Sequence, residues 1–244
     1  MNLLTDDGVR LHARRWHPSA ASPSAVVLVH GFTGSKDHPD VVRVAEGLAA
    51  AGFEVLSYDA RGHQLSDGLC TLGDTERHDV AAAVAEARRI ADRVVTVGAS
   101  MGGIAALRHA GSDADLDGVV TVSAPARWRL PLNATGLFAT GLTRTRPGRW
   151  FAARHLGVRI DPRWTNALPP EAVTPDIRVP LAVIHGTEDR MIPLAEAHRL
   201  RRAATGPARL DVVPGMGHAF DERGIPAIVG AVRWAVERHP AAGR

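Results

Sequence analysis

The chain has 244 residues, of which 45% are hydrophobic and 23% charged, and its formal net charge is +3. This composition is typical of one globular domain with a full hydrophobic core. Cys70 is the only cysteine, which excludes an intrachain disulfide and gives no reason to expect an oxidising compartment. The N-terminal residues lack the apolar core of a signal peptide, and no apolar run approaches the roughly 20 residues that span a bilayer. We therefore expect a cytoplasmic protein without stable membrane insertion.

The positive charge comes almost entirely from arginine, because Lys36 is the only lysine. Basic residues indicate nucleic-acid binding where they line a groove together with stacking aromatic side chains. The chain has one tyrosine and five phenylalanines, which is too few for such a surface. We therefore expect no nucleic-acid partner.

The N-terminal residues predict a β-hairpin, because two short strand-like runs flank the turn sequence Asp6-Asp7-Gly8. After it, short apolar runs typical of buried strands alternate with stretches of helical spacing. We expect strands at residues 25–30, 53–59, 93–98, 117–125, 178–186 and 208–215, and helices at residues 40–52, 74–91, 101–111, 193–204 and 224–238.

This alternation predicts an α/β fold with a mostly parallel central sheet of about eight strands, flanked by helices. Residues 126–176 break the alternation, since they contain no clear strand pattern. We expect residues 1–125 and 177–244 to form the core, and residues 126–176 to form a small cap (lid). Ligands of open parallel sheets bind beyond the carboxyl ends of the strands, so an insertion at this point would cover the site.

Residues 98–102, with the sequence GASMG, lie between a predicted strand and a predicted helix. Glycines on either side of Ser100 remove side chains that would collide in a sharp turn. The following helix N-terminus directs free N–H groups at the site. This is the context of the G-x-S-x-G nucleophile elbow. The alternative is that Ser100 only caps the helix, and the strand before it and the helix after it favour the nucleophile.

A serine nucleophile requires a general base and an acid that orients the base. The elbow predicts the chain order serine, acid, histidine, with each residue placed after a later strand. Asp189 follows the strand at 178–186, and His218 follows the strand at 208–215. Glu188, beside Asp189, is the alternative acid.

An oxyanion hole combines the N–H after the nucleophile with one from the loop after an earlier strand. The first is that of Met101, and the second is that of Phe32. Gly31 permits the close turn that directs the Phe32 amide inward, and the Phe32 ring would line the acyl pocket. His30, just before them, is expected to hold the loop by hydrogen bonds.

Five motifs together resemble the α/β-hydrolase fold enzymes of the carboxylesterase and monoacylglycerol-lipase type. They are HGFTGS, DARGHQLSDG, GASMGG, HGTEDRMIP and GMGHAF, and the resemblance covers the chain except residues 126–176. It implies a Ser100–His218–Asp189 triad, an oxyanion hole from Phe32 and Met101, and no metal or cofactor. In the family the second motif is structural, and here Gln64 stands in it where glycine is usual.

The resemblance implies a serine hydrolase that cleaves short- to medium-chain acyl esters, monoacylglycerols included, through an acyl-enzyme. Its partner would be a small-molecule acyl ester, and the protein a monomer or homodimer. The same triad would also serve a thioesterase, an amidase or an enzyme that cleaves a carbon–carbon bond beside a carbonyl. A ligand-binding protein without turnover is a further alternative, against which the complete serine, histidine and aspartate set argues.

The expected cap is rich in arginine and apolar residues, with Asp161 as the only acid between residues 127 and 163. Trp128 and Phe138 are predicted to contact substrate together with Gly31 and Phe32. Three interpretations of the arginines remain open: a solvated outer face, recruitment of an anionic substrate, and transient contact with a membrane surface. The arginines are Arg127, Arg129, Arg144, Arg146, Arg149, Arg154, Arg159 and Arg163.

Overall fold

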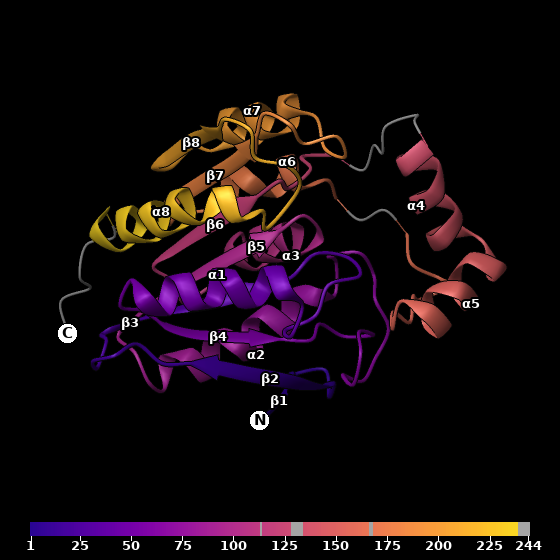
Figure 1. Cartoon of the computed structure of the whole chain (residues 1–244), viewed down its shortest axis with the longest axis horizontal. Coiled ribbons are helices and arrows are strands. Elements are labelled where there is room, and N and C mark those ends of the chain that lie inside the picture. The colour runs from indigo at the N-terminus through magenta and orange to yellow at the C-terminus, as the bar shows by residue number, and fades with distance from the viewer. Residues whose placement is uncertain (113, 128–133, 166–167, 239–244) are drawn as a thin grey trace.

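The computed structural model describes residues 1–112, 114–127, 134–165 and 168–238 (Figure 1). Its centre is an eight-stranded sheet with the strand order β1-β2-β4-β3-β5-β6-β7-β8. The hairpin strands β1 and β2 are antiparallel at one edge, β2 pairs antiparallel with β4, and the remaining neighbours are parallel. The predicted α/β class and mostly parallel sheet are therefore confirmed. The strands are β1 (Asn2–Leu4), β2 (Arg10–Trp16), β3 (Ser24–Val29), β4 (Glu54–Tyr58), β5 (Arg93–Ala99), β6 (Gly118–Val122), β7 (Leu181–Gly186) and β8 (Ala208–Val213).

Helices cover both faces of the sheet, which explains why the central strands are continuously apolar. One face is covered by α1 (Pro39–Ala50) and α8 (Ile225–Arg238). The other is covered by α2 (Glu76–Arg88), α3 (Met101–Ala110) and α7 (Leu194–Ala203). All six residues of β3 are buried, as are all residues of β6 and β7.

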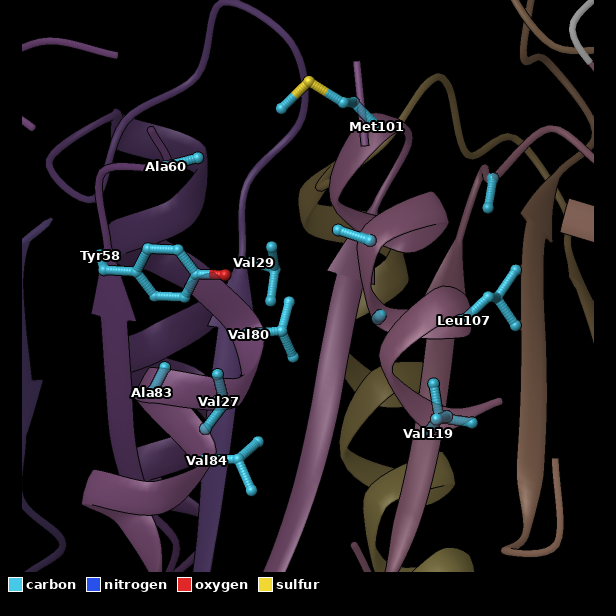
Figure 2. Packing of buried hydrophobic residues seen from close by; sticks show 14 of the residues in the cluster. Val27, Val29, Tyr58, Ala60, Val80, Ala83, Val84, Met101, Leu107 and Val119 are labelled. Atoms are coloured by element: carbon cyan, nitrogen blue, oxygen red, sulfur yellow. The ribbon is translucent and has the colours of Figure 1, made fainter. Parts of the chain in front are cut away.

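Each face of the sheet has its own hydrophobic core, and the side chains of a strand alternate between the two. Val27 of β3 packs with α2 and α3, whereas Val26 of the same strand packs with α1 and α8. Figure 2 shows the first core, in which Val80 and Val84 of α2 lie near Val27 of β3. A polar side chain at any of these positions would be buried without a partner, so the alternation sets the register of the sheet.

Two helices, α4 (Ala134–Arg144) and α5 (Arg146–His155), pack against each other and lie at one end of the molecule (Figure 1). The short helix α6 (Pro170–Val173) and a 3₁₀ turn at Thr174–Asp176 lead back to β7. Within 126–176, the described residues form no strand, only isolated bridges at Val158 and Ile160.

Hydrogen bonds attach the segments before α4 and after α5 to the core. The buried carboxylate of Glu196 on α7 accepts hydrogen bonds from the amides of Ala126 and Arg127, at 3.1 and 3.0 Å. After α5, the Arg159 amide donates to the Gly62 carbonyl at 2.7 Å, and the Cys70 amide donates to the Arg159 carbonyl at 2.7 Å. The helix pair is thus attached on both sides to segments near the carboxyl ends of the strands.

The loop of residues 59–68 is held by buried polar groups. Arg61 Nε donates to Asp79 at 2.8 Å, and its terminal nitrogens donate to both oxygens of Asp7 at 2.7 and 2.9 Å. Gln64 has a φ of 45°, a left-handed conformation that favours glycine. Its side chain packs against Gly157, where an added Cβ would lie 2.7 Å from Gln64 Nε2.

Through the described part of the chain, every helix is too short or too polar to cross a bilayer.

Candidate active site

A cavity of about 390 Å³ lies where the carboxyl ends of β3, β5 and β8 meet the helix pair α4–α5. It contains the residues that follow those strands and residues from α4. Its described lining is mostly apolar. The lining residues are His30, Gly31, Phe32, Thr33, Gly34, His38, Asp40, Val41, Ala99, Ser100, Phe138, Ala139, Leu142, Leu156, Met191, His218, Ala219 and Phe220.

Ser100 lies on a sharp turn between β5 and α3, with φ 52° and ψ −116°. A non-glycine residue with positive φ is strained and persists where its surroundings impose it. The flanking glycines impose it here. A Cβ on Gly98 would lie 2.3 Å from the Gly102 carbonyl oxygen, and one on Gly102 would lie 2.4 Å from the Val29 carbonyl oxygen. The turn therefore exists only because both positions lack side chains.

His218 and Asp189 form a hydrogen-bonded pair, with His218 Nδ1 donating to Asp189 Oδ2 at 2.8 Å. The other carboxylate oxygen, Oδ1, accepts from the amides of Met191 and Ile192, both at 2.9 Å. The proton on Nδ1 leaves the lone pair of the neutral ring on Nε2. His218 lines the same cavity as Ser100, so a base is available on the side where the serine lies.

Asp189 is ionised over the physiological pH range. Burial of its side chain, which is 0% exposed, raises the pKa of the carboxyl. The partners of the carboxylate outweigh the effect of burial and lower the pKa to about 2. They are the His218 ring, through its hydrogen bond and its charge, the Ile192 amide and the Ser123 hydroxyl. Glu188, the alternative acid, is exposed, and His218 bonds to Asp189 instead.

The amides of Phe32 and Met101 are available for a ligand. Among the hydrogen bonds of the described residues, neither backbone N–H has an acceptor within the protein. Gly31 brings the loop close to Ser100, since a Cβ there would lie 3.3 Å from Ser100 Cβ and 3.3 Å from the Ala99 carbonyl oxygen. This geometry suits two donors directed at a developing negative charge.

His30 is a support for this loop and not a base. Its Nε2 accepts from the Ala60 amide at 3.0 Å, so Nδ1 carries the proton and donates to the Gly31 carbonyl at 2.8 Å. The ring is fully buried, and burial lowers its pKa to about 3. It is therefore neutral, with both nitrogens already engaged.

Three of the four residues predicted to contact substrate, Gly31, Phe32 and Phe138, line the cavity with Ser100. Phe138 is 60% exposed and lies at the rim. The fourth, Trp128, lies outside the described residues.

Sequence reasoning missed Ser123 as a residue of the site. The strand predicted at 117–125 ends at Val122, and the next residue turns with φ 53° and reaches the His218 loop. The sequence VVTVSA does not mark the end of β6, because the buried Ala124 continues the apolar pattern beyond it. A serine at the carboxyl end of a central strand was the available clue.

The comparisons with known proteins agree with this architecture. The model of the family described as "Alpha/beta hydrolase family" matches residues 26–229. A relative named non-heme chloroperoxidase, from Burkholderia pyrrocinia, is 26% identical over 271 residues, covering 89% of this chain and 92% of its own.

Two solved structures have the same fold. The esterase Pf2001 of Pyrococcus furiosus superposes with a TM-score of 0.74 at 22% identity, covering 98% of this chain and 91% of its own. Est1E of Butyrivibrio proteoclasticus, solved with ferulic acid bound, gives 0.70 at 20% identity, covering 99% of each chain. With a family match that spans most of its length, this chain belongs to the α/β hydrolase family.

Proposed function

We propose that this protein is a serine hydrolase that cleaves carboxylic esters with short- to medium-chain acyl groups. Ser100 is the nucleophile, His218 the general base and Asp189 the residue that orients the base. The observation that carries the proposal is the 2.8 Å hydrogen bond between His218 and Asp189, in a site where His218 lines the same cavity as Ser100 on its strained turn.

In the proposed reaction, Ser100 Oγ attacks the ester carbonyl carbon while His218 Nε2 takes the hydroxyl proton. The tetrahedral oxyanion accepts hydrogen bonds from the Phe32 and Met101 amides, and losing one such donor typically costs about 10²–10³ in rate. His218 then gives its proton to the alcohol, which leaves. Water attacks the acyl carbon as His218 takes a proton from the water. The bond between Ser100 Oγ and the acyl group then breaks, His218 returns the proton to Oγ, and the acid is released.

We assign residues 126–176 as the cap of this site. Its described part contributes Phe138, Ala139, Leu142 and Leu156 to the cavity lining. A volume of about 390 Å³ is at the small end of the range of roughly 300–1,000 Å³ for small-molecule sites. Such a volume favours short- and medium-chain acyl groups over long ones. Among acyl bonds we choose the ester, because a protein of the same fold, Pf2001 of Pyrococcus furiosus, is named an esterase.

The arginines of the cap support an outer-face role. Arg127 pairs with Glu196 at 3.0 Å, Arg159 donates to the carbonyls of Gln64 and Ser66, and Arg144 lies over the Trp164 ring at 3.9 Å. No arginine occurs among the described residues that line the cavity. These contacts favour neutral acyl esters over anionic substrates.

The test is hydrolysis of p-nitrophenyl esters from acetate to palmitate by the wild type, with Ser100→Ala as the blank. We expect kcat/KM to peak at a short or medium chain length, because the cavity excludes the longest chains, and the variant to show no turnover above buffer. Wild-type rates equal to those of Ser100→Ala on every ester would contradict the proposal. Monoacylglycerols of the preferred chain length then test the same pocket with a natural type of ester.

A further inference from the structure

Ser123 is a buried residue at the carboxyl end of β6, between the loop that carries Asp189 and the loop that carries His218. It is 0% exposed and has a φ of 53°. Serine has no intrinsic preference for the left-handed backbone conformation, and strained conformations of this kind are frequent at functional sites. Its backbone N–H donates to the Ile184 carbonyl of β7 at 3.0 Å, which anchors the turn to the strand that leads to Asp189.

The Ser123 hydroxyl reaches the second loop. Its Oγ accepts a hydrogen bond from the Ala219 amide, the residue directly after His218, at 3.1 Å. Ala219 has a φ of 61°, so the backbone beside His218 is also held in a strained conformation. Because Oγ is the acceptor in this bond, the hydroxyl proton is left to donate elsewhere.

The acceptor that we assign to this proton is the Asp189 carboxylate. Hydrogen bonding from the Ser123 hydroxyl is one of the causes that lower the pKa of Asp189. The other groups facing this carboxylate are His218, the amides of Met191 and Ile192, and His185, whose Nε2 lies 3.7 Å from Oδ2 and donates to the Ile192 carbonyl. Of these groups, Ser123 is the one that comes from a third segment, the end of β6, while its hydroxyl accepts from the amide beside His218.

We propose that Ser123 is a positioning residue that fixes the His218 ring against Asp189 by bonding to the amide after His218 and to the Asp189 carboxylate. The inference rests on the proposed function, in which His218 is the base. Ser123 is not among the described residues that line the cavity. It acts by limiting the rotation of the His218 loop, so that Nε2 stays directed at the serine.

The test compares Ser123→Ala, Ser123→Gly and the control Ser66→Ala. Alanine removes the hydroxyl and keeps the strain, whereas glycine removes the hydroxyl and relieves the strain. Ser66 is a matched control, since it is also 0% exposed and its Oγ accepts from the His12 amide and donates to the Asp59 carbonyl, outside the cavity. Thermal unfolding of all three variants measures the structural cost of losing a buried hydroxyl.

Two readouts separate positioning from stability. We expect kcat on the preferred p-nitrophenyl ester to fall about tenfold in both Ser123 variants, with KM unchanged. The free energy of a hydrogen bond to a charged group corresponds to a rate change of about this size. The second readout is the downfield proton resonance of His218 Nδ1–H, assigned by its absence in His218→Gln. It is expected to shift or broaden in both Ser123 variants and to stay unchanged in Ser66→Ala.

A wild-type kcat and an unchanged resonance in Ser123→Ala would overturn the proposal. Recovery of kcat in Ser123→Gly would also overturn it, because the backbone strain and not the hydroxyl would then be responsible. The resonance is measured on the resting protein without substrate. A failure of esterase activity in the wild type therefore refutes the proposed function and leaves the Ser123 test intact.

Discussion

Replacing His218 by glutamine is expected to lower kcat on p-nitrophenyl esters by about 10⁴-fold or more, because the proton of Ser100 then has no acceptor. Glutamine fills much of the same space, but its amide does not take up a proton near neutral pH. The side chain of His218 is partly exposed at 23%, so the melting temperature should change little. Steady-state kinetics at saturating ester, beside a thermal melt, measure both effects.

The control for this variant is His198→Gln, which makes the same exchange at an exposed position on α7. It should keep wild-type kcat. If His218→Gln kept its rate within tenfold of the wild type, His218 would not be the base and the assignment of the triad would be wrong.

Replacing Gly98 by alanine is expected to lower the free energy of unfolding by about 3 kcal/mol and to abolish esterase activity, because the clash is with backbone. The added Cβ would lie 2.3 Å from the Gly102 carbonyl oxygen and 2.8 Å from the Gly103 Cα. Neither atom belongs to a side chain that can rotate away. Separation of β5 from α3 would relieve the contact, and that movement would displace Ser100. Urea denaturation followed by circular dichroism measures the loss.

Gly141→Ala is the matched control on α4, where an added Cβ meets no atom within 4 Å. Alanine is a better helix former than glycine by up to about 1 kcal/mol, so this variant should be as stable as the wild type or more so. Equal unfolding midpoints for Gly98→Ala and the wild type would show that the turn at Ser100 does not depend on its glycines.

The turn at Ser100 and the alternation of strands and helices along the chain were predictable, because they depend on local patterns. Glycines at fixed offsets from Ser100 and continuous apolar runs can both be recognised in the amino-acid sequence. The positions and conformations of backbone groups are harder to predict from the sequence. The free amides of Phe32 and Met101 were placed by the motif, whereas the reversal at Ser123 interrupts an apolar run without altering it.

The helix α5 shows a second limit of sequence reasoning. Its sequence RPGRWFAARH has a Pro-Gly pair near its start, which is a turn signal, so the sequence predicts no helix there. In the structure the Thr145 side chain caps it by accepting from the Gly148 amide at 3.0 Å. Its close packing on α4 occurs where a Cβ on Gly148 would lie 2.0 Å from the Gly141 carbonyl oxygen. A contact between two helices of this kind depends on tertiary structure, which periodicity within one segment does not contain.

The reaction of the protein with a fluorophosphonate probe, followed by intact mass and peptide mapping, tests the central claim most directly. The probe reports an activated serine and needs no knowledge of the natural substrate. We expect a single adduct, located on Ser100, that is absent from Ser100→Ala and forms much more slowly in His218→Gln. An unmodified wild type, or an adduct on another residue that persists in Ser100→Ala, would contradict the central claim.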